Sequence, residues 1–96
     1  MKSREITVAD REPRIIEADE SPVLVGASVA RVYLPHADPT LPNCVKDVGH
    51  VIEIKAPKFA PVEVLSNTGT RVGTVPAYCT GVATLVDIDP VVWTLR

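Results

Sequence analysis

The sequence predicts an all-β protein: a small antiparallel β-sandwich or jelly-roll-like barrel with an extended N-terminal arm. Valine, isoleucine and threonine make up 30 of the 96 residues, and β-branched side chains favour pleated, half-buried strands over helices. Nine prolines and five glycines are scattered along the chain, which interrupts it too often for long helices. Short segments of alternating apolar and polar residues follow one another closely, as in sandwiches and barrels.

The length fits one domain. A chain of 96 residues buries enough surface for one modest core. That core must be aliphatic, because aromatic residues make up only 4% of the sequence. We divide the chain into an N-terminal arm, residues 1–13, and a β-sandwich domain, residues 14–96.

The N-terminal arm begins the most charged part of the chain. The first 20 residues hold ten of the 22 charged side chains, so we do not expect the segment to be deeply buried as a whole. Ile6 and Val8 alternate as in one short strand, and a second strand is expected to start at Ile15. We predict that the arm pairs with a partner outside the core, and a frayed terminus is the alternative. The candidate contact residues are Arg4, Ile6, Val8, Arg11, Arg14 and, from the other end of the chain, Trp93.

Seven further strands are expected after Ser21. No connection between them is long enough for a crossover helix, so we expect mainly antiparallel pairing. The segment Ser66–Gly69 tolerates positive φ and predicts a hairpin over 64–73. The expected strands are 23–25, 30–34, 51–56, 62–65, 72–75, 82–88 and 91–95.

One long connection, residues 35–49, separates the second and third of these strands. Its three prolines exclude a strand. We expect a helical turn within Leu41–Val48 that ends at Gly49 in a left-handed conformation. Near the C-terminus, Asp89-Pro90 marks a corner between the last two strands. Trp93 shares a face with Val91 and Leu95, so we expect it to anchor the core, with cover of an interface as the alternative.

The residue types that carry out chemistry do not form a recognisable site. Cysteine and neutral histidine are the usual zinc ligands, but no two of them are two to four positions apart, as structural zinc sites require. We therefore predict no metal and no cofactor. The histidines are expected to be exposed, and the cysteines reduced and buried, with a disulfide in an oxidising compartment as the alternative. The residues concerned are His36, Cys44, His50 and Cys79.

Other catalytic patterns are also weak, so we predict that the chain is not an enzyme. Asp87 and Asp89 lie on one face, but Asp89-Pro90 is an ordinary turn initiator, which is the favoured interpretation. The serines lack the glycine-flanked elbow of a nucleophile. The glycines of Gly69–Gly73 are not followed by the Gly-Lys-Thr/Ser of a phosphate-binding loop.

Charge and hydropathy narrow the class of partner. The net charge of −2 gives no basic field for nucleic acid. No apolar run approaches the roughly 20 residues that span a bilayer, so no membrane partner is expected. Met1–Glu5 is not followed by the apolar region of a secretory signal, and we expect a soluble product made in the cytosol.

The order of features from Glu17 to Arg96 resembles a β-domain that recurs in virion proteins of tailed bacteriophages, in tail fibres, spikes and capsid-associated proteins. Those domains run from a strand into a Leu-Pro-x-Ala element and a loop ending in glycine. A strand of the type x-Ile-x-Ile-Lys, a glycine hairpin and a final alternating strand leading to tryptophan then follow. The matching segments are 32–37, 49–55, 66–73, 83–86 and 92–95.

This resemblance implies a structural role in a virion. Fibres carry the domain within a longer polypeptide, whereas a free-standing copy resembles a capsid decoration, or cement, protein. Such proteins typically form trimers or dimers on the capsid exterior and bridge coat subunits. We therefore expect a homo-oligomer bound to the major capsid protein on the virion surface, after synthesis in the bacterial cytoplasm. A tail-fibre, baseplate or receptor-binding adaptor, with tail or fibre subunits as partners, is the alternative, and an enzyme is the weakest hypothesis.

Overall fold

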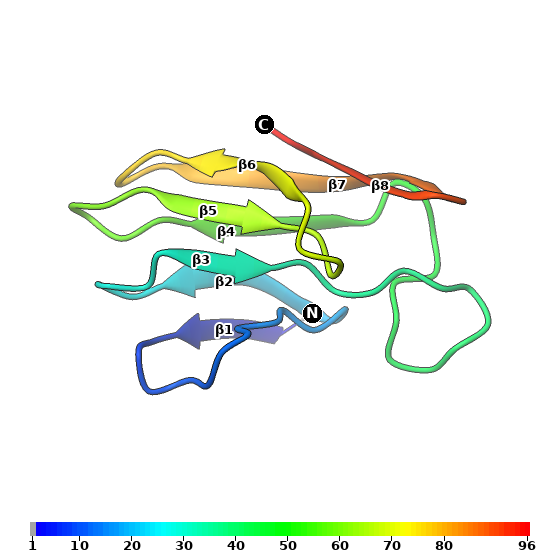
Figure 1. Ribbon diagram of the computed structural model, residues 1–96, viewed down its shortest axis with the longest axis horizontal. Helices are drawn as coiled ribbons and strands as arrows, with labels where there is room; N and C mark the ends of the chain where they lie inside the picture. The colour runs from blue at the N-terminus through cyan, green and yellow to red at the C-terminus, as the bar shows by residue number, and fades with distance from the viewer. Residues whose placement is uncertain (1) are drawn as a thin grey trace.

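Eight strands form two sheets in the computed structural model of the protein, which describes residues 2–96 (Figure 1). The fold is a small all-β sandwich, as the sequence predicted. All seven strands expected after Ser21 are present, with bounds that differ by a few residues at most. The strands are β1 (Lys2–Ile6), β2 (Glu20–Val25), β3 (Arg31–Tyr33), β4 (Val51–Lys55), β5 (Val62–Leu65), β6 (Arg71–Val75), β7 (Thr80–Ile88) and β8 (Val91–Leu95).

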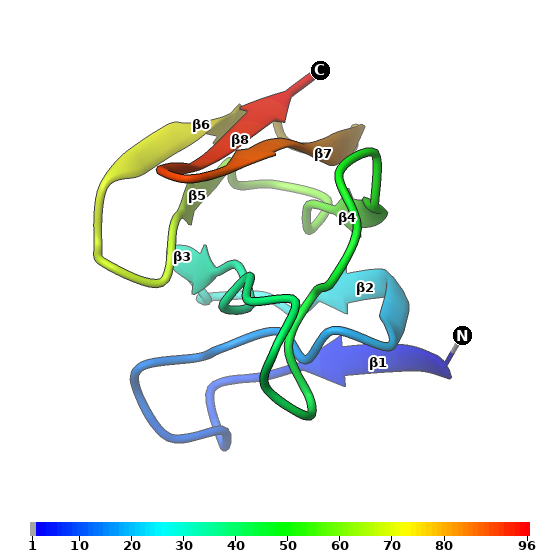
Figure 2. The ribbon, with the colours of Figure 1, turned by 90° about the vertical axis from the view of Figure 1, so that its right-hand side faces the viewer.

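The larger sheet has five strands in the order β1-β2-β4-β7-β8, and the smaller has three in the order β3-β5-β6. Figure 2 shows the two sheets facing each other, with β6 and β8 side by side where they adjoin. Gly73 lies at this contact. A Cβ atom there would lie 2.9 Å from the side chain of Leu95, so a larger residue would require this leucine to move.

Strand pairing is mixed, so the expectation of mainly antiparallel pairing was wrong. The pairs β1–β2, β2–β4 and β3–β5 are parallel, and the pairs β4–β7, β5–β6 and β7–β8 are antiparallel. Parallel neighbours need a crossover connection. Here a strand of the opposite sheet serves as the crossover, because the chain passes from β2 to β3 and back to β4. No helix is needed for this connection.

Alternation along each strand places the aliphatic core between the sheets. In β4, Ile52 and Ile54 are fully buried, whereas the residues between and beside them are exposed. Strand β7 repeats the pattern with Ala83 and Leu85. The core is aliphatic apart from Trp93, as the composition required. Its largest members include Ile6, Ile16, Val23, Val32, Leu34, Ile52, Ile54, Val62, Val64 and Leu85.

The N-terminal arm belongs to this core. Strand β1 pairs with β2 of the same chain, and Ile6 has no exposed surface. Further along, the Ile16 amide donates to the Tyr33 carbonyl at 2.8 Å and the Tyr33 amide to the Arg14 carbonyl at 2.9 Å, which covers the outer edge of β3. The strand expected to pair outside the core therefore pairs within it. Burial of an isoleucine stabilises by about 1.5–3 kcal/mol, which favours docking of β1 despite its charges.

The connections agree with the sequence in part. The β5–β6 hairpin forms as predicted, with Gly69 at φ +89°. Gly49 has φ +93°, also as predicted, but residues 41–48 contain turns and no helix. The helical turn was therefore a wrong prediction. The loop instead folds back on itself, because the Val45 amide donates to the His36 carbonyl at 2.9 Å and the Val45 side chain enters the core.

Candidate docking surfaces

The structure separates the six predicted contact residues into three kinds. Ile6 and Trp93 are buried, with 0% and 6% exposure, and are not available to a partner. Arg4 and Arg14 bind groups of their own chain. Only Val8, which is 60% exposed, and Arg11 face solvent.

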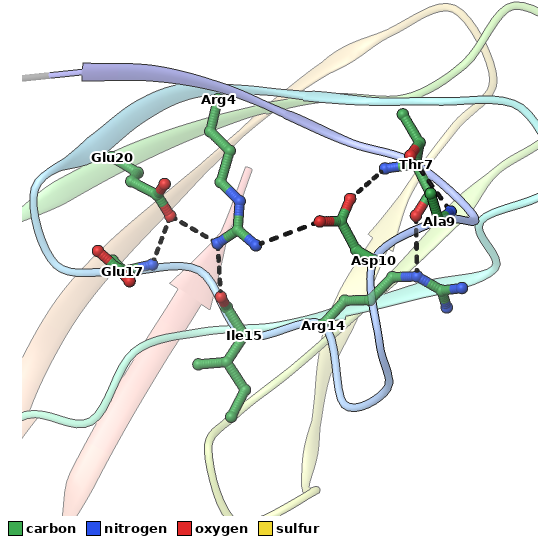
Figure 3. A network of polar contacts seen from close by, with 8 residues as sticks. All are labelled: Arg4, Thr7, Ala9, Asp10, Arg14, Ile15, Glu17 and Glu20. Carbon is green, nitrogen blue, oxygen red and sulfur yellow. Dashed lines mark hydrogen bonds and ion pairs between the residues drawn. The ribbon is translucent and has the colours of Figure 1, made fainter.

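Arg4 holds β1 to the start of β2 through a polar network (Figure 3). Its Nη1 atom donates to the Ile15 carbonyl and to Glu20 Oε1, each at 2.8 Å. Glu20 is buried, and the same oxygen accepts the Glu17 amide at 2.7 Å. Charge-assisted bonds of this kind are stronger than neutral ones. Arg4 therefore stabilises the fold from within.

The turn after β1 is held in a similar way. Asp10 Oδ2 accepts the Thr7 amide at 2.7 Å, and Asp10 Oδ1 lies 4.0 Å from Arg4 Nη2. Arg14 donates to the Thr7 carbonyl at 3.3 Å and pairs with Glu12 at 2.7 Å. Asp10, Glu12 and Arg14 are thus bound within this region, whereas Arg11 is exposed. Contacts such as Arg4–Glu20 join residues 16 positions apart, which alternation along one strand does not reveal.

Trp93 lies in the core, so the core-anchor interpretation is confirmed. Trp93 of β8 lies opposite Leu85 of β7. The Leu85 amide in turn donates a hydrogen bond to the His50 carbonyl at 2.9 Å. Within residues 2–96, the buried atoms Trp93 Nε1 and His50 Nε2 have no hydrogen-bond partner. His36 is exposed, as expected, but His50 is half-buried. His50 is partly buried because it directly precedes β4 and lies beside Leu85, a residue of β7 that faces the core.

One end of the sandwich exposes aromatic side chains. We call it the loop end and define it by the connections 26–30, 56–61 and 76–79, which Figure 1 shows together at the left. Phe59 is 88% exposed and Tyr78 64% exposed. The Lys58 ammonium lies 5.7 Å from the centre of the Phe59 ring, and the Lys55 ammonium lies 5.8 Å from that of Tyr78. Apolar and cationic groups thus lie side by side.

Backbone contacts fix the loop end. The Tyr78 amide donates to the Pro57 carbonyl at 2.9 Å, and the Ala56 amide to the Cys79 carbonyl at 3.0 Å, which joins two of the connections. Ser28 and Tyr78 adopt positive φ, 68° and 64°, which is unfavourable for residues with a side chain. A shallow hollow beside Phe59 is lined by Ala27, Ser28, Pro57, Lys58 and Ala60.

Phe59 and Tyr78 lie outside every predicted strand, so strand patterns in the sequence do not indicate the loop end. Periodicity identifies residues that face a core, and neither of these does. The available signal was an aromatic side chain in a connection bounded by Pro57 and Pro61. Rigid loops between strands commonly carry binding residues.

Acidic groups elsewhere are bound locally. Asp38 Oδ1 accepts both the hydroxyl and the amide of Thr40, at 2.6 and 2.8 Å. These two hydrogen bonds lower the pKa of Asp38 below its ordinary value of 3.8. Asp87 Oδ1 accepts the amides of Ile88 and Asp89, which confirms the turn interpretation of this aspartate pair.

Neither cysteine is buried, contrary to expectation. Cys79 is exposed at the loop end, Cys44 is half-buried in the long loop, and both are free thiols. Both lie in connections instead of core-facing strand positions.

Within residues 2–96, no three histidine, cysteine or acidic side chains converge on a point that would hold a metal ion. No helix in this range is long and apolar enough to cross a membrane.

Comparison of the chain with protein-family models, curated proteins and solved structures finds no match. The resemblance to phage virion domains therefore stays a prediction. The loop end is the candidate docking surface that the geometry itself provides.

Proposed function

We propose that the chain is a virion structural protein, a capsid decoration protein that docks on the outside of a phage head and stabilises it. The observation that carries this proposal is the exposure of Phe59 and Tyr78 at the loop end. These are two of the four aromatic residues of the chain, and the other two, Tyr33 and Trp93, are at least half-buried.

Exposure of this kind has a cost that docking removes. Burial of a phenylalanine side chain is favourable by about 1.5–3 kcal/mol, and aromatic residues are enriched at the centres of protein interfaces. The loop end is also fixed by the hydrogen bonds that join its connections. A fixed surface loses little conformational freedom on binding, which raises affinity.

In the decoration role, the loop end would bind the assembled coat. A protein that binds only the assembled lattice stabilises that lattice by mass action, and the contributions of many bound copies on one particle add up. The proposed partner is the major capsid protein. The proposed assembly is a trimer or dimer of the chain on the virion surface, formed after synthesis in the host bacterial cytoplasm.

A binding experiment tests the proposal. The protein is mixed with undecorated capsids of the virus that encodes it, and the capsids are sedimented. We expect saturable binding at a fixed ratio to coat subunits, and a rise in the temperature at which the heads open. Protein that stays in the supernatant at every concentration would contradict the proposal. If the labelled protein is found only at the tail of assembled virions, the fibre or baseplate alternative is favoured.

Variants show whether the loop end is the surface used. Phe59→Ser removes the most exposed apolar side chain and should lower capsid affinity about tenfold, the effect of losing one interface anchor. Leu41→Ser is the matched control, because Leu41 is 46% exposed in the long loop, away from the loop end. Both variants should unfold at about the temperature of the unchanged protein, since neither side chain is in the core.

A further inference from the structure

We infer that the loop end recognises an acidic protein surface, in which Phe59 enters an apolar recess while Lys55 and Lys58 pair with carboxylates around it. The inference rests on the proposed function and specifies the chemistry of the coat surface that would receive the protein. It follows from the charges at this end, their positions beside the aromatic rings, and the fixed backbone.

The loop end is basic in a chain that is acidic overall. The net charge is −2, yet the connections 26–30, 56–61 and 76–79 contain no acidic residue and one basic residue, Lys58. Lys55 is the last residue of β4 and adjoins them. Within residues 2–96, neither lysine has a carboxylate within ion-pair distance. Both charges are therefore free to pair with a partner.

The turn after β1, residues 7–13, also faces this end and carries acidic side chains. These are already bound. Asp10 accepts the Thr7 amide at 2.7 Å and faces Arg4 at 4.0 Å, and Glu12 pairs with Arg14 at 2.7 Å. These acidic side chains are therefore engaged by groups other than Lys55 and Lys58.

The lysines lie beside the aromatic rings, at 5.7 Å from the Phe59 ring centre and 5.8 Å from that of Tyr78. A cation near a ring face is attracted to it and keeps its charge. The arrangement therefore presents an apolar centre with a cationic rim. A complementary surface has the opposite order, an apolar recess bordered by aspartate or glutamate.

The backbone conformation and hydrogen bonds of the connections hold this arrangement in place. Tyr78 and Ser28 adopt positive φ, and unfavourable backbone conformations tend to occur at functional sites, where the surrounding structure maintains them. The hydrogen bond from Tyr78 to Pro57 joins the connections that carry the two rings. The rings and lysines are therefore presented together.

A protein surface fits these residues better than an anionic membrane does. Lipid recognition by charge uses clusters of about four to eight lysines and arginines, and the loop end has two lysines. A membrane would also accept any orientation of the rings, so it gives no reason to fix Tyr78 at a positive φ. We therefore take a protein as the occupant.

A matched pair of charge reversals tests the inference. Lys58→Glu reverses a charge at the loop end, and Lys46→Glu makes the same change in the long loop, where Lys46 is exposed. Capsid binding is measured between about 0.01 M and 0.15 M salt, where screening changes strongly. We expect Lys58→Glu to weaken binding about tenfold at the lower salt and to flatten the salt dependence. Lys46→Glu should bind as the unchanged protein does.

The outcomes separate the two proposals. If the unchanged protein binds capsids and Lys58→Glu binds equally well at each salt concentration, the partner surface is not acidic, and the inference fails while the decoration role stands. If the unchanged protein does not bind capsids, both fail. Sedimentation with phosphatidylserine–phosphatidylcholine vesicles completes the test. Vesicle binding that is lost in Lys58→Glu, without capsid binding, would identify a membrane as the occupant and overturn the inference.

Discussion

The N-terminal region, residues 2–20, and the loop end differ in how their side chains are satisfied. The N-terminal region carries ten of the chain's 22 charges, and Arg4, Asp10, Arg14 and Glu20 bind within the chain. The loop end has few charges. Its two lysines have no carboxylate within ion-pair distance in residues 2–96, and each lies beside an exposed aromatic ring. Charge density along the sequence therefore did not indicate which side chains lack an internal partner in residues 2–96.

The reason is physical. Acidic and basic residues that alternate along a segment can pair with one another when the segment folds back, and the backbone supplies further hydrogen-bond partners. An exposed aromatic ring cannot be satisfied by a neighbouring charge or backbone group in this way, because only burial removes its apolar surface from water. In this fold, no strand or loop of residues 2–96 covers Phe59, which keeps 88% of its surface exposed.

The strongest test of this comparison is to remove the core contact of the N-terminal region. Ile6→Ala should lower the free energy of unfolding by about 2–5 kcal/mol, because it deletes a fully buried side chain and leaves a cavity. Val8→Ala, two residues further along and exposed, should change it by less than about 0.5 kcal/mol. Urea unfolding measures both. Equal and small effects would mean that β1 is a loose arm after all.

A smaller effect is expected from the polar network. Arg4→Ala leaves the buried Glu20 carboxylate without its arginine and should destabilise the protein by about 2 kcal/mol. Arg11→Ala is the control, since Arg11 is exposed and should contribute little. Combining Arg4→Ala with Glu20→Ala should cost less than the sum of the single effects. Strict additivity would show that the two side chains do not interact in solution.

At the loop end, relief of backbone strain should slightly raise stability. Tyr78→Gly places glycine at a positive φ, where a side chain is unfavourable, and should stabilise the protein by about 0.5 kcal/mol. Tyr78→Ala keeps a Cβ atom and should give no such gain. Thermal unfolding distinguishes the two. A marked loss of stability in both variants would show that the Tyr78 ring supports the fold and is not free for docking.

The smallest effect concerns an acid bound by its own loop. Because hydrogen bonds from Thr40 lower the pKa of Asp38 below 3.8, the side chain should stay ionised to a lower pH than an ordinary aspartate. These bonds favour the folded state above the ordinary pKa, and their contribution is lost as the pH falls through the folded pKa. An NMR titration should show this low midpoint, and Thr40→Ala should return it toward the ordinary value. An unchanged midpoint in Thr40→Ala would exclude the Thr40 bonds as its cause.

Local signals predicted much of the fold. The alternation in 51–56 and 82–88 predicted β4 and β7 to within two residues at each end, and Gly69 marked the hairpin between β5 and β6. These features depend on residues close together in the sequence, which is why they were accessible. The burial of Trp93 followed in the same way, from its phase with Val91 and Leu95.

Fold class, an aliphatic core and strand positions after Ser21 were thus determined by composition and period alone. Parallel pairing, the docking of β1 and the exposure of Phe59 were decided only by the tertiary structure. Each depends on which distant segments meet: β2 lies beside β4 because β3 crosses to the other sheet, and Arg4 is bound because Glu20 faces it. Such contacts are decided by the packing of the whole chain, because the partner that buries or pairs with a segment lies far away in the sequence. Local sequence patterns do not indicate which distant segment this partner is.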